Sequence, residues 1–246
     1  MDVKSVKPKV TLLRYTPEPE KTVALAAKLC YSDLDIDMLK TDTEAKDASK
    51  LINLLIKMGH LSPIEHANFT FSLEGVSRAL LAQITRHRIA SFSVKSQRYV
   101  GADKTFNYII PPAIEALGQE AIDEYHSQME QIHNWYIGWQ QKLGEGEAGN
   151  EDSRFVLPNA AETKLIMTMN ARELMHFFAL RCCNRAQWEI REVAWRMLEE
   201  VLKVAPNLFK TCGPSCVSGA CKEGKMSCGK ANEVRLRQQA LIIPKE

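Results

Sequence analysis

Apolar residues recur at helical spacing along much of the chain. Within residues 43–60 they fall at positions 48, 51, 52, 54, 55 and 58, which predicts an amphipathic helix. Residues 17–32 carry Pro and Glu near their start and also predict a helix. Further helices are expected over residues 76–88, 112–143, 171–182 and 187–204.

Three shorter stretches have the composition of strands. Residues 8–16 are rich in strand-forming residues, and residues 67–75 alternate so that Phe69 and Phe71 share one face. Residues 163–169 predict another short strand. Helices dominate and there is no regular βαβ alternation. We therefore predict an α+β fold, a helix-rich single domain with a small, mainly antiparallel sheet.

Two segments are expected to be irregular. Residues 144–152, "GEGEAGNED", predict an exposed loop, and residues 212–230 are rich in Gly and Ser. The domain boundary is placed before the cysteine-rich segment. This gives a main domain over residues 1–208 and a cysteine-rich tail over residues 209–246.

Composition and charge narrow the class of protein. The 246 residues are 45% hydrophobic and 25% charged, which is ordinary for a globular protein. A formal net charge of +2 gives the whole molecule no electrostatic reason to bind nucleic acid or a membrane, so its cations must act locally. No apolar run approaches a signal peptide or a membrane span, and a cytoplasmic location is the expectation.

Cations gather just after an apolar stretch, in "RHRIASFSVKSQR" over residues 86–98. On the helix predicted over residues 76–88, an apolar stripe ends in Gln83, Arg86 and His87. An unpaired charge that faces a core is very costly, and only Glu74 is near in sequence. Arg86 should therefore meet either a distant carboxylate or a bound anion. A helix end that reaches solvent is the plain alternative.

A second stretch, "NARELMHFFALR", repeats the pattern, because Arg181 continues an apolar helical stripe. Asn170 has a structural role available as the N-cap of this helix, with Glu173 completing a capping box. His176 lies beside Phe177, and by sequence alone a hydrogen-bonded core histidine is the simpler interpretation.

A third stretch, "GHLSPIEH", places His60, Ser62, Glu65 and His66 on a loop. Their spacing matches no helical zinc motif, so no metal site is predicted there.

Seven cysteines raise the question of thiol or metal chemistry. Four are in the tail with spacings of x3, x4 and x6: Cys212, Cys216, Cys221 and Cys228. Zinc, an iron–sulfur cluster, disulfides and idle thiols are all compatible with this pattern, and no metal is assigned. Cys182 and Cys183 follow Arg181, where helical spacing favours small buried residues over a catalytic nucleophile.

These stretches together resemble one protein family. "RHRIASFSVKS" has RHR, seven residues and then Ser, and it resembles the signature of the flavin-dependent thymidylate synthases. "GHLSPIEH", "SRFVLP" and "NARELMHFFALR…AQWEIR" resemble further blocks of that family. The blocks follow in family order from about residue 50 to residue 200.

The resemblance implies an activity, its cofactor and its partners. It implies a methyltransferase that converts dUMP to dTMP by reductive methylation. Methylenetetrahydrofolate would supply the carbon, NADPH the reducing equivalents, and bound FAD would relay the hydride. It also implies a homotetramer whose active sites are shared between subunits, with no nucleic-acid or membrane partner.

The resemblance also implies roles for individual residues. Those matched to dUMP contacts are Gln83, Arg86, Ser96, Gln97, Arg98, Arg154 and Arg181. Those matched to FAD contacts are His60, Ser62, Glu65, Arg86, His87, Arg88, Asn170, Arg172 and His176. Arg181 is matched to the catalytic arginine at the uracil edge, which favours loss of the N3 proton.

Two positions depart from the family pattern. Val94 stands where many relatives carry Glu or Gln, which leaves a direct role for this position in doubt. His176 stands where asparagine is frequent.

Two other function classes are alternatives for this sequence. A nucleic-acid-binding module would use the residue 86–98 cations on phosphates, but the near-neutral charge and the apolar stripes argue against it. A metal-regulated interaction protein organised by the tail would contain stoichiometric zinc or iron.

Overall fold

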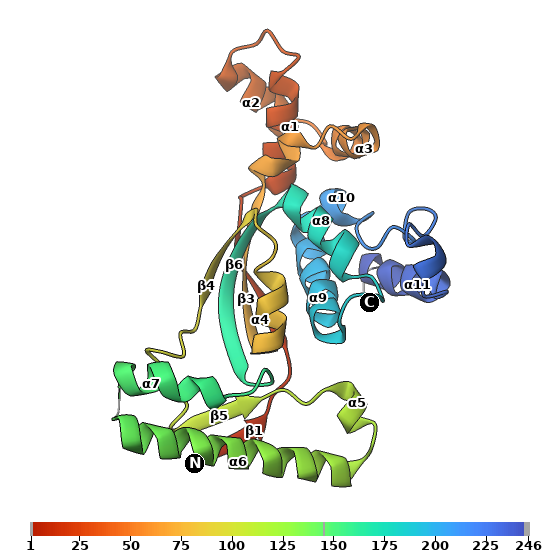
Figure 1. Cartoon of the computed structure of the whole chain (residues 1–246). Coiled ribbons are helices and arrows are strands. Elements are labelled where there is room, and N and C mark those ends of the chain that lie inside the picture. Colours follow the sequence, from red (N-terminus) through yellow and green to blue (C-terminus); the bar gives the residue numbers. More distant parts are fainter. Residues whose placement is uncertain (1, 145, 244–246) are drawn as a thin grey trace. The chain divides into compact units, whose positions relative to one another are not determined.

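The computed structural model describes residues 2–144 and 146–243, and 54% of it is helical. An antiparallel sheet has the strand order β2 (Lys9–Tyr15), β3 (Asn68–Ser77), β6 (Glu162–Asn170), β4 (Ala90–Val94) (Figure 1). A separate parallel pair joins β1 (Asp2–Ser5) to β5 (Thr105–Tyr108). The predicted α+β class with its small antiparallel sheet is confirmed. The homotetramer stays a prediction.

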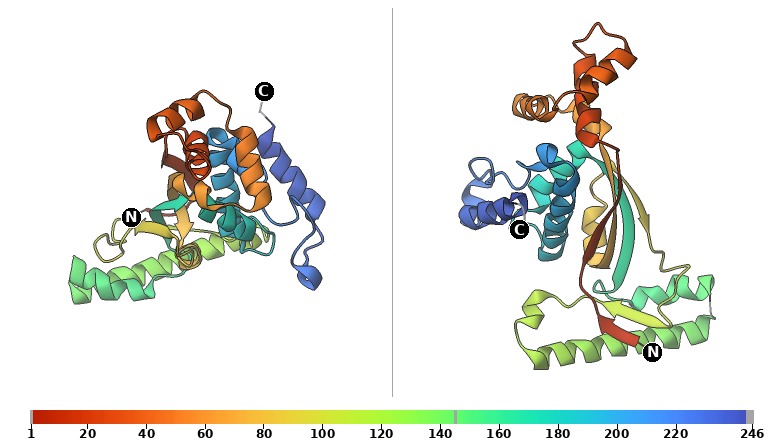
Figure 2. Two further views of the ribbon diagram at one scale, coloured as in Figure 1. Left: turned by 90° about the horizontal axis from the view of Figure 1, so that it is seen from above. Right: turned by 180° about the vertical axis from the view of Figure 1, so that it is seen from behind.

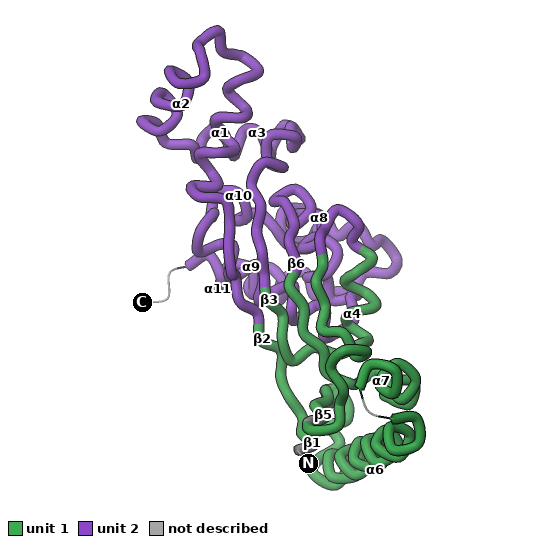
Figure 3. Tube along the Cα trace, turned by 90° about the vertical axis from the view of Figure 1, so that its left-hand side faces the viewer, with its two compact units in different colours: residues 1–9, 72–86, 92–166 green, residues 10–71, 87–91, 167–246 purple. Residues whose placement is uncertain are grey.

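The chain divides into two compact units, each built from three sequence segments (Figure 3). Unit 1 contains residues 2–9, 72–86 and 92–166. Unit 2 contains residues 10–71, 87–91 and 167–243. Strands β3 and β6 each contribute residues to both units. The division predicted between residues 208 and 209 falls within unit 2 and stays a prediction.

Unit 1 is organised around one long helix. Its helical elements are α4 (Arg78–Ile84), α5 (Pro112–Glu115), α6 (Gln119–Leu143), α7 (Glu147–Ser153) and the 3-10 turn η2 (Arg154–Val156). Helix α6 lies along the β1–β5 pair, and Phe106, Tyr108 and Met129 form a core between them (Figure 1). Burial of such apolar side chains is the main force that holds these elements together.

Unit 2 is mostly helical. Its elements are α1 (Pro19–Leu29), α2 (Ile36–Glu44), α3 (Ser49–Met58), η1 (Ser62–His66), α8 (Ala171–Arg181), α9 (Trp188–Val204), α10 (Pro206–Phe209), η3 (Gly224–Met226) and α11 (Ala231–Ile242). Helix α9 packs against α8, α10 and α11, which Figure 2 shows from two directions. Phe177 and Phe178 of α8 are fully buried, and Phe178 packs edge-on against Phe209 of α10. This packing fixes the orientation of α8.

Several predicted elements are confirmed by the structure. Residues 8–16 and 163–169 contain β2 and most of β6, and α8 and α9 match the helices predicted there. Phe69 and Phe71 of β3 are both fully buried, as alternation requires. The tail over residues 212–230 is irregular apart from η3.

The helix predicted over residues 76–88 is wrong at both ends, because α4 is only Arg78–Ile84. Ser77 ends strand β3 and caps the helix, accepting a hydrogen bond from the Leu80 amide at 3.0 Å. At the other end the Thr85 hydroxyl donates to the Leu81 carbonyl at 2.9 Å, which competes with helix continuation. Arg86 and His87 therefore follow the helix rather than lie on its stripe.

The single helix predicted over residues 112–143 is two helices. Gly118 has a φ of 100°, a left-handed conformation that favours glycine, and it separates α5 from α6. Helix α3 likewise begins at Ser49, later than predicted. It buries Ile52 and Leu55 but leaves Leu54 exposed.

The loop predicted over residues 144–152 is also wrong, because Glu147–Ser153 form helix α7. Gly and Asn suggest a loop, yet the Asn150 side chain is buried and hydrogen-bonded to Tyr136 and Gln140 of α6. These tertiary contacts override local propensity. Glu145 lies outside the described residues.

Within the described residues, every helix is too short or too polar to cross a lipid bilayer.

Candidate functional site

The two units divide the predicted site residues between them. All residues matched to FAD contacts except Arg86 belong to unit 2, and all residues matched to dUMP contacts except Arg181 belong to unit 1. Arg86 and His87 are sequence neighbours assigned to different units. Each group is therefore described within its own unit.

Unit 2 contains a hollow of about 680 Å³. Its lining residues come from η1 and the residue before it, the end of β6, α8 and the segment 87–91: Leu61, Glu65, Ile89, Asn170, Arg172, Glu173, Met175 and His176. Four of these residues, Glu65, Asn170, Arg172 and His176, are among those matched to FAD contacts. A hollow with both polar and apolar walls is typical of a small-molecule site.

The start of α8 brings these side chains together. Asn170 Oδ1 accepts a hydrogen bond from the Glu173 amide at 2.8 Å, which confirms the predicted N-cap. The Ala171 amide donates to the Ala67 carbonyl at 2.7 Å and ties α8 to the residue that follows η1. Arg172 and Glu65 then form an ion pair across the wall of the hollow. The exposed pair adds little stability, so its role is positional.

The Glu173 side chain does not complete the predicted capping box. Its carboxylate Oε1 lies 3.2 Å from His87 Nδ1, and the other ring nitrogen of His87 accepts a hydrogen bond from Arg181 Nε at 3.0 Å. His87 is only 6% exposed and packs edge-on against Phe177 at 4.9 Å. A buried chain therefore connects Glu173, at the hollow, to Arg181.

The protonation state of His87 follows from its partners. Arginine can only donate, so His87 Nε2 must be the acceptor, and Nδ1 carries the proton that is donated to Glu173. Burial lowers the pKa of His87, and the Arg181 charge lowers it further, while the Glu173 carboxylate opposes them. His87 is thus a neutral imidazole that holds Arg181 in one orientation. Its predicted flavin contact stays a prediction.

The other residues matched to FAD contacts have varied positions. His176 is exposed and lines the hollow, so its interpretation as a core histidine is wrong. His60, Ser62 and Arg88 are exposed but do not line the hollow. Their contacts stay predictions.

In unit 1, Arg98 has carboxylate partners that sequence analysis did not foresee. Its guanidinium pairs with Glu147, at 2.9 Å from Nε, and with Glu151 at 3.4 Å. The hydrogen bond that Arg98 donates to Glu147 raises the pKa of Arg98. Both acids lie on α7, in the segment expected to be a loop. Arg98 is therefore neutralised by carboxylates of its own chain.

A buried hydrogen-bond network holds the backbone of residues 98–102, which follow strand β4. Asn150 Nδ2 donates to the Arg98 carbonyl at 3.1 Å, and the Tyr136 hydroxyl donates to Asn150 Oδ1 at 3.1 Å. The Ala102 amide in turn donates to the Tyr136 hydroxyl at 3.1 Å. A Cβ at Gly101 would lie 2.8 Å from Asn150 Oδ1, so the close approach requires glycine there. The network fixes the segment that carries Ser96, Gln97 and Arg98.

Arg86 and Arg88 are both exposed and, within the described chain, have no carboxylate within salt-bridge distance. Arg86 is therefore not directed into the core of this chain, contrary to the expectation. Its charge is available to an external anion.

Sequence analysis missed Arg78. This arginine begins α4 and is half-buried, and burial followed by the charge of Arg154 lowers its pKa. Neither arginine forms an ion pair with any carboxylate in residues 2–144 and 146–243, although Arg154 Nε donates to the Glu151 carbonyl at 3.1 Å. Two nearby cations without a counterion favour a bound anion. In sequence Arg78 gave no signal because it stands apart from every motif.

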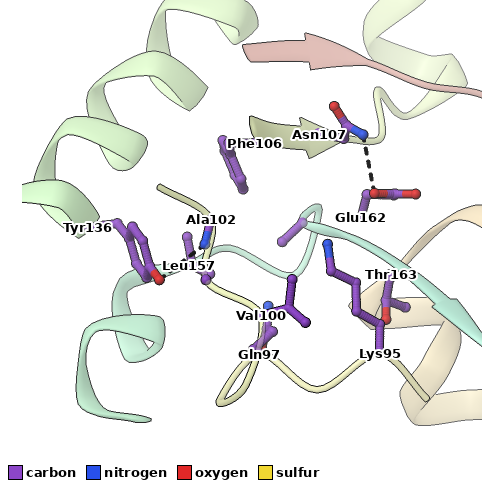
Figure 4. Close-up of a pocket in the computed structure, with 12 residues that line it drawn as sticks. Lys95, Gln97, Val100, Ala102, Phe106, Asn107, Tyr136, Leu157, Glu162 and Thr163 are labelled. Carbon is purple, nitrogen blue, oxygen red and sulfur yellow. Dashed lines mark hydrogen bonds between the residues drawn. The ribbon is translucent and has the colours of Figure 1, made fainter. Parts of the chain in front are cut away.

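A small hollow of about 60 Å³ lies beside the segment that carries Ser96, Gln97 and Arg98 (Figure 4). Lys95, Gln97, Asn107 of β5 and Thr163 of β6 all line it, and Lys95 lies beside Thr163 (Figure 4). It is much smaller than the roughly 300–1,000 Å³ of ordinary ligand sites. It is therefore not a nucleotide site by itself.

The cysteines are free thiols, and no group of three or more His, Cys, Asp or Glu side chains in the described residues has an arrangement that would hold a metal ion. Cys182 is fully buried, as expected, and burial raises its pKa. Cys183 is half-buried. Val94 is half-buried in β4, and the structure gives no account of its departure from the family pattern.

Comparisons with known proteins agree with these features. Residues 11–207 match the family described as thymidylate synthase complementing protein, Thy1. The chain is 54% identical to the flavin-dependent thymidylate synthase of Clostridium tetani, an alignment that covers 94% of this chain and 97% of the relative. It is 49% identical to that of Geobacter sulfurreducens, with 92% and 96% covered. It is 44% identical to that of Nitratidesulfovibrio vulgaris, with 91% and 95% covered.

Identity at this level over nearly the whole length of both proteins, together with the matched motifs, shows that the chain belongs to the flavin-dependent thymidylate synthase family.

Proposed function

We propose that this chain converts dUMP to dTMP, with methylenetetrahydrofolate as carbon donor, NADPH as reductant and FAD as bound cofactor. Family membership supports the reaction and its flavin. The observation that carries the residue assignments is the buried chain from Glu173 through His87 to Arg181.

The hollow in unit 2 fits a flavin by its size and by its donor set. Its volume of about 680 Å³ lies within the range of ligand sites. Leu61, Ile89 and Met175 supply apolar walls for a flat ring, while Arg172 and His176 supply polar contacts. FAD, when bound there, would supply the hydride-transfer chemistry of the proposed reaction. The protein's own part is to bind and orient the ring and to exclude water from it.

Arg181 is assigned the chemical role. Carbon C5 of uracil becomes nucleophilic when N3 loses its proton, and a fixed guanidinium at the uracil edge stabilises that anion. A charge about 4 Å away at an effective dielectric near 20 contributes about 4 kcal/mol. Neutral His87 accepts from Arg181 Nε and so holds the guanidinium in place before the substrate arrives. The charge is thereby preorganised.

The nucleotide's phosphate and sugar are assigned to the cations and donors of unit 1. Ser96 and Gln97 lie on the segment that Asn150 anchors. Arg98 would exchange its exposed Glu147 partner for the ligand's phosphate, an exchange that solvent screening makes easy. Arg154 would bind the same anion without losing a carboxylate partner.

A homotetramer with active sites shared between subunits is part of the proposal. Exposed Arg86 and Arg88, which pair with no carboxylate among the described residues, support it because a neighbouring subunit's bound nucleotide or flavin would neutralise them. NADPH as the reductant and a cytoplasmic location stay predictions.

The test is product formation by the full chain. Purified protein with FAD, NADPH, methylenetetrahydrofolate and dUMP should form dTMP. Arg172→Ala should weaken FAD binding measured by fluorescence quenching. Arg185→Ala, which removes an exposed arginine paired with Glu223 outside the hollow, should not. Failure to form dTMP by protein that binds FAD would overturn the activity. Equal FAD affinity in both variants would overturn the flavin site.

A further inference from the structure

A second hollow in unit 2, about 340 Å³, is lined by four thiols. Cys183 comes from the residues just after α8, and Cys216, Cys221 and Cys228 come from the irregular tail. Cys212, which sequence spacing grouped with the tail thiols, is buried and does not line the hollow, and burial raises its pKa to about 12. The fold thus replaces one member of the sequence cluster with Cys183.

Hydrogen bonds from three arginine and asparagine side chains hold the tail around this hollow. Arg235 of α11 donates to the carbonyls of Cys216 at 2.7 Å and Gly219 at 3.1 Å. Arg185 donates to the Met226 carbonyl at 3.0 Å. Asn184, next to Cys183, lies with its Nδ2 3.7 Å from Cys228 Sγ. The thiols therefore share one anchored cavity and are not scattered along a loose loop.

The four thiols differ in their surroundings. Cys228 is exposed, and hydrogen bonds from the Lys230 backbone and then from Asn184 lower its pKa. Cys216 is buried, and its pKa is raised first by burial and then by the neighbouring thiols Cys221, Cys183 and Cys228. The thiolate is the nucleophilic form of cysteine. Cys228 is therefore the most reactive of the four thiols, because it is exposed to solvent and its pKa is lowered. Cys221 is half-buried on the same segment.

We propose that this hollow is a thiol–disulfide exchange site, in which Cys228 attacks a small-molecule disulfide and Cys221 then closes an internal disulfide. Exposure and the Asn184 contact select Cys228 as the attacking group. Cys221 is chosen as its partner because it lines the same hollow, is less buried than Cys216, and lies on the same glycine-rich segment. The site is independent of the proposed synthase chemistry.

The reaction balances in two steps. Cys228 loses its proton to solvent and attacks one sulfur of the small disulfide, whose S–S bond breaks and releases one thiolate. Cys221, deprotonated in turn, attacks Cys228 Sγ in the mixed disulfide and releases the second thiolate. Two protein thiols are oxidised and one small disulfide is reduced to two thiols, which take up the two protons.

The first test follows the released thiol in solution. Reduced full-length protein is mixed with dithiodipyridine, and the absorbing thione is measured over time. We expect a fast phase that releases two thiones per chain. Cys228→Ser should abolish this phase, and Cys221→Ser should halve it and leave a mixed disulfide on Cys228. Cys30→Ser is the matched control, because Cys30 is exposed but lies at the end of α1, away from the thiol hollow.

The second test maps the bond by peptide analysis of the wild type and of two variants. Tryptic cleavage at lysine places Cys228 on residues 226–230 and Cys221 on residues 211–222. The second peptide also carries Cys212 and Cys216, so the variants identify the linked cysteine. After oxidation by a limiting amount of dithiodipyridine, mass spectrometry should find these two peptides linked. The link should persist in Cys216→Ser and vanish in Cys221→Ser.

Three results would overturn the proposal. Loss of the fast phase in Cys30→Ser would place the reactive thiol elsewhere. Persistence of the fast phase in Cys228→Ser, in a variant whose circular dichroism matches the wild type, is the second. Oxidised protein in which Cys228 is joined to Cys183 or Cys216, or is not joined at all, is the third.

Discussion

Glu173→Gln tests the buried chain that holds Arg181. The change keeps the shape of the side chain but removes its charge. Glutamine can accept from His87 Nδ1 through its oxygen or donate to it through its amide, so the tautomer of His87 is no longer enforced. In the second tautomer His87 Nε2 carries a proton and repels the Arg181 Nε–H. Arg181 then loses its fixed orientation.

The magnitudes follow from these contacts. A hydrogen bond to a charged group is worth about 1.5–3 kcal/mol and a neutral one about 0.5–1.5, so the free energy of unfolding should fall by about 1 kcal/mol. That corresponds to a Tm lower by about 2–4 °C for a chain of this size. Because the guanidinium remains but is misplaced, kcat should fall by about 10–100-fold. Complete removal of the guanidinium would forfeit about 4 kcal/mol of stabilisation and lower kcat by about 10³-fold.

The assay measures kcat for dTMP formation, Tm by calorimetry and the Kd for FAD. Glu192→Gln is the matched control, because Glu192 of α9 pairs with Arg196 of the same helix and Arg237 of α11 and does not line the hollow. We expect it to change Tm but not kcat. If both variants keep the same kcat, the positioning argument is refuted. If Glu173→Gln chiefly loses FAD binding, Glu173 is a flavin contact instead.

Three further predictions concern other parts of the structure. Arg78→Leu should raise the KM for dUMP with little change in kcat, because it removes one of the two cations, Arg78 and Arg154, that pair with no carboxylate in the described residues. Initial-rate kinetics test this, and an unchanged KM would exclude the anion site. Asn150→Ala should lower the free energy of unfolding by about 1–3 kcal/mol, measured by urea titration. It should also raise the KM for dUMP, because the Arg98 carbonyl loses its hydrogen-bond donor. A normal KM in the destabilised variant would make the network purely structural. The pKa of His87 is lowered from 6.5 in the folded protein, so below pH 6.5 the unfolded protein binds a proton more readily than the folded protein does. Stability should therefore be full above pH 6.5 and fall as the pH drops below it. Urea titrations across this range check the sign, and His87→Gln should flatten the profile.

Periodicity predicted the elements whose apolar pattern is local. Helices α8 and α9 bury stripes that can be counted in the sequence, and β3 buries Phe69 and Phe71 by simple alternation. Periodicity failed where a single polar side chain determines whether the backbone is helical. Ser77 starts α4 later than its apolar stripe does, and Asn150 turns a loop-like composition into a helix by burying its amide.

The candidate site could be predicted only as a set of residue types. Motifs identified His87, Glu173 and Arg181 separately, but nothing local indicates that residues so far apart in sequence share hydrogen bonds. Arg98 pairs with Glu147, which lies far away along the sequence, and no spacing indicates this pairing. In both cases the missing information is long-range packing, which spacing along one element does not contain.

The most direct test of the account is the N3 pKa of bound dUMP, measured by ultraviolet difference titration on FAD-loaded protein. A fixed guanidinium worth about 4 kcal/mol would lower that pKa by up to about 3 units relative to free dUMP. The account predicts a clear lowering in the wild type that disappears in Arg181→Ala at saturating dUMP. The same N3 pKa in both proteins would contradict it.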